Sequence, residues 1–454
     1  MINAQGGFGN SSRRMESITL QIHSDGHWHD ALVVNFDSPK GSLRSRCITH
    51  YLPDYLADQY IQLGTVKAPT VSANRPLEWD IRRELAPAFL HDVIPAGAAR
   101  RHILSRAVVP PGMSTDLFLL QQFAAAPIGH MRVKSSGETL YPTSEVTGGA
   151  TRAEIVQAGM GFLDQARESG WPIIGALGAG GVAQKMLLVE DASGRLYPEG
   201  AARDADVCRH WFVKFPRNNA TQLDRDILHS EYCFYRALGQ LGVDTISAEG
   251  LSYEAAKVPS VWMQRFDRKV SPCGIERIAV ESMYSLCGIT QSVIRMEHVD
   301  VLERLAKAWI AAGQTSEIPT MVSEYLRRDL INLIVGNTDN HCGNLSILRS
   351  KERVSFAPIY DLAPMLLDIE GIVRSTRWPT AMERLGSVDW AAVCAHFAHW
   401  ANPEWLLDRL RADARLLLAL PDLLLDLGLP QEAWRSPLIP LSRLEDTFRS
   451  WKLM

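Results

Sequence analysis

Hydrophobic and polar residues follow a distinctive order between residues 325 and 361. Apolar side chains three to four positions apart predict an amphipathic helix at the start of this stretch, and they are Tyr325, Leu326, Leu330, Leu333 and Ile334. The polar sequence GNTDNHCGN comes next and predicts a loop, because it is dense in turn-forming residues. Two short apolar runs, 345–348 and 354–357, then predict a β-hairpin that ends just before Asp361.

Three polar side chains in this unit have an informative order and spacing. Asn344 comes five residues after Asp339, and Asp361 comes after the hairpin. Phosphoryl transfer needs a carboxylate that orients or deprotonates the attacking hydroxyl, and oxygen ligands that hold Mg²⁺ against the nucleotide phosphates. Protein kinases supply these groups in the same order, although here TDNH replaces HRD and YDL replaces DFG. The alternative is a solvated surface loop that is merely rich in Asp and Asn.

A lysine and a glutamate earlier in the chain fit the same chemistry. Lys214 is the one charge on a mostly apolar strand, HWFVKFP. In the helix that follows, Glu231 shares one stripe with Ile227, Tyr235 and Leu238. An unpaired carboxylate among apolar neighbours is costly, so Lys214 is the natural partner, and kinases aim a phosphate-binding lysine in this way. The alternative places Glu231 at the rim of the stripe, in water, with Lys214 reaching solvent.

Glycines precede another lysine in the segment 173–191. Gly178, Gly180 and Gly181 come before Lys185 and a short strand. Glycines allow backbone N–H groups to approach phosphate oxygens closely, and a lysine adds a positive charge. The segment lacks the G-K-[ST] of a Walker A loop and the G-x-G-x-x-G of a dinucleotide site, so ordinary turn glycines are the alternative.

The sequence VPSVWMQRFDR, residues 258–268, predicts a short buried strand that ends in a charged turn. In a two-lobed kinase the backbone of such a connector hydrogen-bonds the adenine. Met263, Gln264 and Phe266 are the candidates for this role.

The remaining pattern predicts an α+β region followed by a helical one. The expected elements are a hairpin over 18–36, a helix–loop–helix over 89–104, a helix from Ser114 to Phe123, a strand over 128–133, a helix over 151–165, and helices over 300–312, 320–336 and most of 380–430. At 454 residues, the chain is long enough for two or three subdomains.

Composition and charge narrow the class of protein. A net charge of −4 gives no bulk attraction to nucleic acid or to anionic membranes, so any DNA contact needs a local patch or a partner. Seven scattered cysteines without a Cys-x-x-Cys motif argue against disulfides or a zinc knuckle. The N-terminus lacks an apolar signal core, and charges and a proline interrupt the leucine-rich run near residue 420. We therefore expect a cytoplasmic protein without a membrane span.

Several motifs in order resemble those of one family. NTDNHCGN, APIYDL, RFDR, FLHDVIPAG and PIGHMRV are similar to segments of the HipA family of bacterial serine/threonine kinases, whose best-known members are toxins of HipBA toxin–antitoxin modules. The resemblance implies a two-lobed, protein-kinase-like α+β fold, with a mixed α/β N-terminal lobe and a mostly helical C-terminal lobe. It implies an N-terminal α+β subdomain over 16–150, an ATP-binding lobe over 151–268 and a helical lobe over 269–454. The Gly-, Asn- and Ser-rich residues 1–15 predict a flexible tail before them.

The resemblance also implies roles for particular residues. Asp339 would be the catalytic base, Asn344 and Asp361 the Mg²⁺ ligands, and Glu231 the residue that positions Lys214. The residues that would contact ATP are Gly180, Gly181, Val182, Ala183, Gln184, Lys185, Lys214, Gln264, Arg265, Phe266, His341, Cys342, Gly343, Asn344, Tyr360 and Asp361. The family transfers the ATP γ-phosphate to serine. Its characterised toxins act on aminoacyl-tRNA synthetases, and they pair with a helix-turn-helix antitoxin that binds operator DNA.

One departure from the family pattern leaves a second function open. Family toxins often carry a serine at the start of the Gly-rich loop, whose autophosphorylation switches the enzyme off, but Gly178 stands here. A weakly active or inactive protein that serves mainly as the partner of a DNA-binding repressor is therefore an alternative. A metal-dependent hydrolase using Asp339, His341 and Asp361 is a further one, but it leaves Lys214 and Glu231 unexplained.

Overall fold

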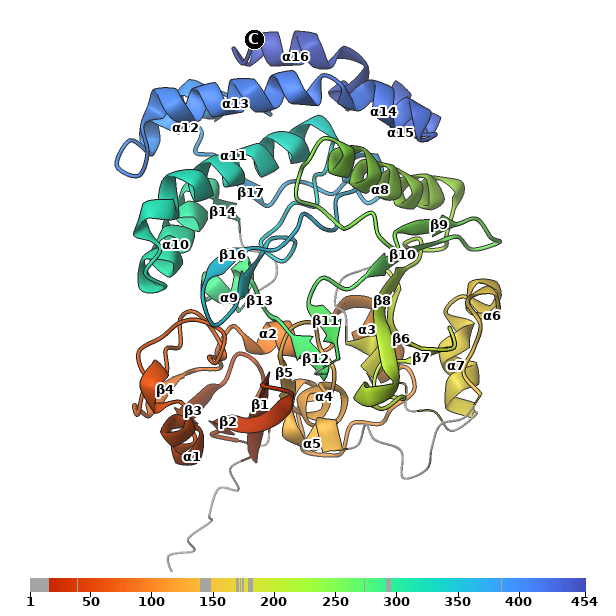
Figure 1. Ribbon diagram of the computed structural model, residues 1–454, viewed down its shortest axis with the longest axis vertical. Coiled ribbons are helices and arrows are strands. Elements are labelled where there is room, and N and C mark those ends of the chain that lie inside the picture. The colour runs from red at the N-terminus through yellow and green to blue at the C-terminus, as the bar shows by residue number, and fades with distance from the viewer. Residues whose placement is uncertain are drawn as a thin grey trace, which may run out of the picture.

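The N-terminal strands form one edge of the molecule in the computed structural model (Figure 1). The structure describes residues 16–38, 40–138, 148–168, 171, 173, 175–178, 183–272, 274–290, 295–384 and 386–454. The predicted tail over 1–15 lies outside these residues.

The first sheet confirms the predicted N-terminal hairpin. Strands β1 (Glu16–Ser24) and β2 (His27–Phe36) pair in antiparallel fashion around the turn at Asp25 and Gly26, both of which have positive φ. Three more strands complete the order β4-β3-β2-β1-β5, and they are β3 (Arg46–Tyr51), β4 (Arg82–Leu85) and β5 (Met131–Val133). The strand expected over 128–133 thus forms in its last three residues.

Short helices lie between residues 53 and 168 of the chain, and they include the predicted ones. They are α1 (Pro53–Asp58), α2 (Leu90–Val93), α3 (Gly97–Leu104), α4 (Thr115–Phe123), α5 (Lys134–Glu138), α6 (Arg152–Ala158) and α7 (Gly161–Glu168). The side chain of Ser114 caps α4 by accepting a hydrogen bond from the backbone N–H of Leu117, as its sequence position predicts.

The second sheet carries both predicted lysines. Its order is β7-β6-β8-β10-β9, and its strands are β6 (Lys185–Asp191), β7 (Leu196–Pro198), β8 (Val207–Lys214), β9 (Ser252–Glu254) and β10 (Ser260–Gln264). Lys185 of β6 pairs with Lys214 of β8, and Val261 of β10 pairs with Lys214 from the opposite edge of β8. The two lysines therefore project from the same face of the sheet.

This sheet separates two hydrophobic cores. Trp211 and Trp262 belong to the core shared with the N-terminal sheet, whereas Val261 and Met263 belong to the core shared with the C-terminal helices. Helix α8 (Gln222–Gln240) begins with a capping box at Thr221 and Asp224 and lies next to the sheet, beneath the C-terminal helices (Figure 1).

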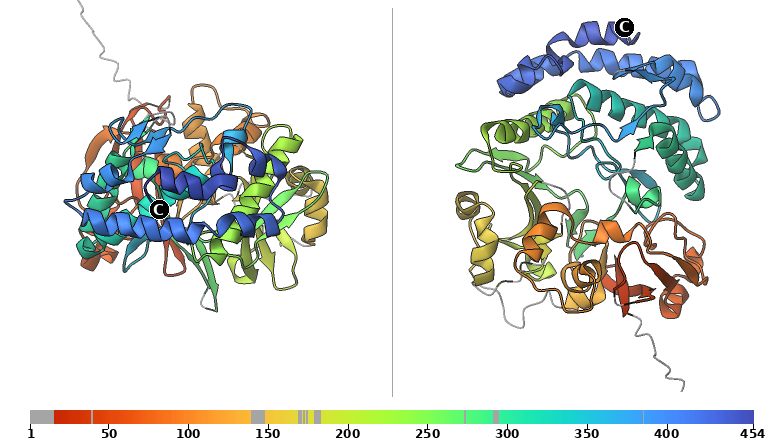
Figure 2. Two further views of the ribbon diagram at one scale, coloured as in Figure 1. Left: turned by 90° about the horizontal axis from the view of Figure 1, so that it is seen from above. Right: turned by 180° about the vertical axis from the view of Figure 1, so that it is seen from behind.

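The C-terminal lobe is mostly helical. Its helices are α9 (Met283–Leu286), α10 (His298–Ala311), α11 (Ile318–Ile334), α12 (Trp390–His396), α13 (Pro403–Leu417), α14 (Leu420–Asp426), α15 (Gln431–Arg435) and α16 (Leu444–Ser450). Helices α12 to α16 form the outer layer, at the end of the molecule opposite the N-terminal sheet (Figure 2). Short 3-10 turns lie at Tyr60–Gln62, Gly175–Leu177, Asp204–Asp206, Thr315–Glu317, Met365–Leu367 and Pro440–Arg443.

Short strands flank the loop GNTDNHCGN in this lobe. They are β11 (Arg268–Ser271) with β12 (Gly274–Arg277), β13 (Ala279–Ser282) with β15 (Ser346–Arg349) and β16 (Val354–Phe356), β14 (Met296–Glu297) with β17 (Thr376–Arg377), and β18 (Glu383–Arg384) with β19 (Ser387–Val388). Helix α11 and the hairpin β15–β16 confirm the predictions for 325–357. The prediction that helices fill most of 380–430 is confirmed by α12, α13 and α14, although β18 and β19 come before α12, which begins after its cap at Asp389.

The fold is thus the two-lobed, kinase-like α+β fold that we expected. The boundaries near 150 and 268 stay predictions. Within the described part of the chain, no helix combines the length and the apolar character that crossing a bilayer requires.

Candidate active site

The end of strand β8 carries the lysine at the centre of the site. Lys214 Nζ lies 2.6 Å from Glu231 Oε2 and 2.7 Å from Asp361 Oδ1. Burial alone would lower the pKa of Lys214, but the carboxylates of Asp361 and Glu231 outweigh burial and raise the pKa above its usual value. The expected contact between Lys214 and Glu231 is therefore present, and it extends to Asp361.

Asp361 receives a second lysine. Lys185 Nζ lies 3.1 Å from Asp361 Oδ2, so each carboxylate oxygen faces a different ammonium group. Burial would raise the pKa of Asp361, but Lys185 and Lys214 outweigh it and hold the pKa far below its usual value. The backbone of Asp361 has φ 49°, a conformation that few residues other than glycine adopt. Such a residue is often found where function fixes the direction of a side chain.

The glutamate on helix α8 is held by a residue for which we predicted no role in the site. The side chain of Glu231 is 1% exposed, and the hydroxyl of Tyr235 donates a 2.7 Å hydrogen bond to its Oε1. The same hydroxyl accepts a hydrogen bond from the backbone N–H of Leu362. Tyr235 follows Glu231 by four positions on the helix, and this spacing is the signal in the sequence that could have identified it.

The loop between α11 and β15 lies beside Asp361. Asn344 Nδ2 donates a 2.8 Å hydrogen bond to the carbonyl of Asp339, and Asn337 Nδ2 lies 3.4 Å from the carbonyl of Asp361. His341 Nε2 is 3.7 Å from Asp339 Oδ1, and the imidazole stacks on Tyr284 with ring centres 5.6 Å apart. The residues at 214, 339, 344 and 361 therefore meet in one region.

An arginine missed in the sequence faces the same loop. Arg217 Nη1 lies 3.4 Å from Asp339 Oδ2, and Arg217 Nε lies 3.4 Å from Asp368 Oδ2. Arg217 Nη2 lies 3.5 Å from Glu370 Oε2. The signal in the sequence is a charged residue directly after the KFP segment, but its partners come from a distant part of the chain.

The connector between the lobes packs against the hairpin. The rings of Phe266 and Tyr360 stack with centres 5.9 Å apart, and the Tyr360 hydroxyl donates a 3.0 Å hydrogen bond to the carbonyl of Gly343. The side chain of Gln264 shares the sheet face of Trp262, opposite that of Lys214, because side chains alternate along β10. Gln264 could contact a nucleotide in this region only through its backbone.

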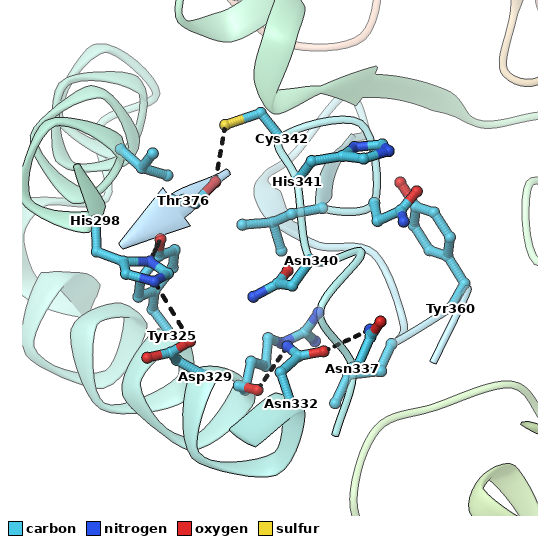
Figure 3. A pocket seen from close by; sticks show the side chains of 15 residues that line it. His298, Tyr325, Asp329, Asn332, Asn337, Asn340, His341, Cys342, Tyr360 and Thr376 are labelled. Carbon is cyan, nitrogen blue, oxygen red and sulfur yellow. Dashed lines mark hydrogen bonds and ion pairs between the residues drawn. The ribbon is translucent and has the colours of Figure 1, made fainter. Parts of the chain in front are cut away.

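Two other predicted residues direct their side chains elsewhere. Arg265 is buried against Asp267, at 2.9 and 2.7 Å, and its backbone N–H donates to the carbonyl of His210. The thiol of Cys342 points toward Thr376 in the interior of the C-terminal lobe (Figure 3). Burial raises the pKa of Cys342 to about 11, so this thiol stays protonated at neutral pH.

The Gly-rich loop is described only at its ends. Gly180, Gly181 and Val182 lie outside the described residues, whereas Ala183 is buried and the carbonyl of Gln184 accepts a 2.9 Å hydrogen bond from the backbone N–H of Phe215. At the other end, a Cβ placed on Gly178 would overlap the carbonyl oxygen of Ala126 and lie 2.8 Å from its carbonyl carbon. No side chain fits there without moving that backbone.

The oxygen atoms of the site suit Mg²⁺ held together with phosphates. The amide nitrogen of Asn344 donates to the carbonyl of Asp339, so the amide oxygen of Asn344, like the carboxylate of Asp361, could hold a metal ion. Among the described residues, no three His, Cys, Asp or Glu side chains are grouped so that they could hold a metal alone. Mg²⁺ commonly takes one or two protein oxygens and completes its shell with water and substrate phosphates. The residues present fit that mode of binding.

Comparison with known proteins identifies the family. The model of the HipA-like C-terminal domain matches residues 177–416, more than half of the chain. The chain belongs to the HipA family. No curated protein matches the sequence.

A solved structure shares the fold of this HipA-family protein. A chain of the Shewanella oneidensis MR-1 complex of HipA, HipB and operator DNA superimposes with a TM-score of 0.61 and 16% sequence identity, over 96% of this chain and 97% of that one. The Helicobacter pylori proinflammatory kinase CtkA gives a TM-score of 0.35 and 14% identity, over 60% of this chain and 89% of that one. The first likeness extends across both lobes.

Proposed function

We propose that this protein is a cytoplasmic protein kinase that uses ATP and Mg²⁺ to phosphorylate a serine of a protein substrate, as a toxin-like regulator of growth. The observation that carries the proposal is the position of Lys214 Nζ, 2.6 Å from Glu231 and 2.7 Å from Asp361. A strand lysine aimed by a helix glutamate is the arrangement with which kinases hold the nucleotide phosphates. Membership of the HipA family supports the same activity.

The two lysines provide the charge that a triphosphate needs. Lys185 and Lys214 now face the two oxygens of Asp361, and both can turn toward phosphate oxygens when a nucleotide enters. The carboxylate of Asp361 and the amide oxygen of Asn344 would then hold Mg²⁺. Bound Mg²⁺ would neutralise charge on the phosphates. Glu231 and Tyr235 keep Lys214 in place during this exchange.

Asp339 has the position of the general base. Its side chain is 26% exposed, so a substrate hydroxyl can reach it, and its backbone is fixed by Asn344. In the proposed reaction the serine hydroxyl gives its proton to Asp339, its oxygen bonds to the γ-phosphorus, and the bond to the β-phosphate breaks. The remaining nucleotide contacts that we propose are residues 180–184, the backbone of 264–266, residues 341–343 and Tyr360.

Phosphoryl transfer to a bacterial extract tests the proposal. The purified protein is incubated with Mg²⁺ and labelled ATP, and phosphorylated serines are identified by mass spectrometry, with aminoacyl-tRNA synthetases as the first expected substrates. Asp339→Asn should lower transfer by about a thousandfold, which corresponds to about 4 kcal/mol in the activation free energy. If the wild-type protein neither binds ATP nor labels any serine, the kinase proposal is wrong.

A second proposal concerns a partner. The Shewanella oneidensis chain of similar fold comes from a complex with HipB and operator DNA. We propose that this protein likewise binds a small helix-turn-helix antitoxin and reaches DNA only through it, since its net charge of −4 gives no bulk attraction to DNA. A pull-down with a co-encoded small protein tests this. If Asp339→Asn keeps the partner and the wild-type protein transfers no phosphate, the main role is binding rather than catalysis.

A further inference from the structure

A third cation, Arg217, adjoins the candidate active site. The sequence predicted no role for it. Arg217 comes three residues after Lys214 and is 8% exposed. Its guanidinium faces the carboxylates of Asp339, Asp368 and Glu370, at 3.4, 3.4 and 3.5 Å. Lys214 and Arg217 thus come from the end of one strand and approach the two aspartates of the site.

The contacts of Arg217 are loose by comparison with others in the molecule. Hydrogen bonds between charged groups are usually 2.7–2.9 Å long, and Arg265 makes bonds of 2.9 and 2.7 Å to Asp267. None of the three carboxylates comes that close to Arg217. Among the described residues, neither its Nε nor the facing Oδ2 of Asp368, both buried, has a hydrogen-bond partner. Arg217 is therefore held in place while its donors stay incompletely used.

The position of Arg217 matches the path of the phosphoryl group. Lys185 and Lys214 face Asp361, where we place the metal and the inner phosphates. Arg217 faces Asp339, where we place the attacking hydroxyl. The γ-phosphoryl group must lie between these two points. A guanidinium beside that path can donate two parallel hydrogen bonds to phosphate oxygens.

We propose that Arg217 is a catalytic residue that binds the γ-phosphoryl group. This rests on the proposed kinase activity. Arg217 exchanges Asp339 for the γ-phosphate oxygens when ATP binds, which frees Asp339 for the substrate hydroxyl. During transfer the bond from phosphorus to the β-phosphate oxygen breaks and its electrons leave with ADP, while the serine oxygen bonds to phosphorus and its proton passes to Asp339. The positively charged guanidinium of Arg217 stabilises the charge on the transferred group.

A different role would make Arg217 only a clamp for the segment after Asp361. Asp368 and Glu370 belong to that segment, and Arg217 Nη1 also lies 3.8 Å from Met365 Sδ. The two roles differ in one respect that can be measured. A phosphate ligand discriminates ATP from ADP, whereas a clamp affects both nucleotides alike.

Calorimetry with Mg²⁺–ATP and Mg²⁺–ADP on the full-length protein separates the two roles. Arg217→Ala should weaken ATP binding by about tenfold and leave ADP binding within about twofold, because one charge-assisted hydrogen-bond set is lost. It should also lower kcat for transfer by about a hundredfold. Arg217→Lys should recover part of the ATP affinity. The matched control is Arg353→Ala, since Arg353 is exposed and pairs with Glu317 at 2.9 Å outside the site.

The possible outcomes are distinguishable. Equal loss of ATP and ADP affinity, or no loss of either, overturns the role of Arg217, and a lower melting temperature would then identify the clamp. If the wild-type protein binds neither nucleotide, the kinase proposal falls together with this one. Arg217→Lys keeps the charge that faces the three carboxylates, so it gives a folded variant on which the ATP-to-ADP ratio can be measured even if Arg217→Ala unfolds.

Discussion

Two clusters in this protein contain the same kinds of charged side chain but differ in how far these side chains are exposed to solvent. In the candidate active site, Asp361 and Asp339 are 22% and 26% exposed, and their partners are the tips of long cationic side chains. In the second cluster, which we call the RFDR cluster (Arg265, Asp267, Arg268 and Glu199), every side chain is at most 3% exposed. Charges that are partly open to solvent can exchange partners, whereas buried charges with fixed partners cannot.

The RFDR cluster is bound to the backbone of the N-terminal region. Asp267 accepts a 2.7 Å hydrogen bond from the N–H of Gly129, and Arg268 donates a 2.8 Å hydrogen bond to the carbonyl of Gly129. Both arginines also reach the carbonyl of Pro127, at 3.4 and 3.3 Å. A motif that points to the family can therefore be a structural one, because here its side chains join two parts of the chain.

Neutralising a carboxylate of the candidate active site should remove activity while the protein stays folded. Asp361→Asn removes the charge that faces Lys185 and Lys214, while Glu231 continues to pair with Lys214. We expect phosphoryl transfer to fall by at least about a thousandfold, or about 4 kcal/mol. The midpoint of thermal unfolding should move by only a few degrees. Transfer above a tenth of the wild-type rate would contradict the assignment of Asp361.

The RFDR cluster should respond in the opposite way. Asp267→Asn leaves two guanidinium groups buried with Glu199 alone, and breaking a buried ion pair in this way costs about 3–5 kcal/mol in the free energy of unfolding. Urea unfolding measures this cost. The control is Glu276→Gln in the nearby pair of Lys269 and Glu276, which is more than half exposed and 3.6 Å long, so its loss should change stability little. Equal effects of the two changes would remove the distinction between the clusters.

A third charged cluster lies beneath the loop of Asp339 and combines features of both. His298 is buried beside Asp329, Arg374 and Tyr325, in a pocket that also reaches Asn340 (Figure 3). Burial lowers the pKa of His298 to about 4, with Asp329 opposing the shift and Arg374 adding to it. Its unfolded pKa is about 6.5. The imidazole is therefore neutral in the folded protein near pH 6, although it would bind a proton when unfolded.

The resulting pH dependence has a definite sign. A lowered pKa in the folded state contributes stability that is present above pH 6.5 and is lost as the pH falls toward 4. The shift corresponds to at most about 3 kcal/mol. His298→Gln should therefore flatten the loss of unfolding free energy between pH 6.5 and pH 4 in urea titrations. If the variant and the wild-type protein show the same slope, His298 does not titrate as its surroundings indicate.

The sequence was most informative where spacing along one element determines a contact. Glu231 could be placed in the buried stripe of α8 because the apolar residues around it recur at helical intervals. The helix, loop and hairpin over 325–357 could be placed because turn formers separate two clear periodicities. The face of Gln264 could also have been found, since residues two apart along a strand share a face and Trp262 is apolar.

Contacts between distant segments could not be predicted from the sequence. Arg217 meets Asp339 from 122 positions away and Glu370 from 153 positions away, and no local pattern predicts such pairs. The resemblance implied a nucleotide contact for Arg265, which stays a prediction for the backbone of this residue. Its side chain lies instead against Asp267 and Pro127, and that packing depends on how the N-terminal region docks.

Substitutions of Gly178 test whether the RFDR cluster also restrains the start of the Gly-rich loop. A Cβ at this position would overlap the carbonyl of Ala126, and the next residue, Pro127, is held by Arg265 and Arg268. Because that backbone cannot move freely, Gly178→Ala should cost about 1–3 kcal/mol in urea unfolding, as overpacking does. Gly161→Ala is the control, since no atom of the described residues lies within 4 Å of a Cβ there.

The same geometry bears on regulation. The side chain of Gly178→Ser would also overlap the carbonyl of Ala126, so this variant should be destabilised as Gly178→Ala is. After incubation with Mg²⁺ and ATP, mass spectra should show no phosphate on residue 178. In the double variant with Asp267→Asn, the segment around Pro127 is held less firmly. The loss of unfolding free energy in the double variant should therefore be smaller than the sum of the losses in the two single variants. A fully additive double variant would mean that Gly178 and the RFDR cluster act independently, and the link between the cluster and the loop would then be absent.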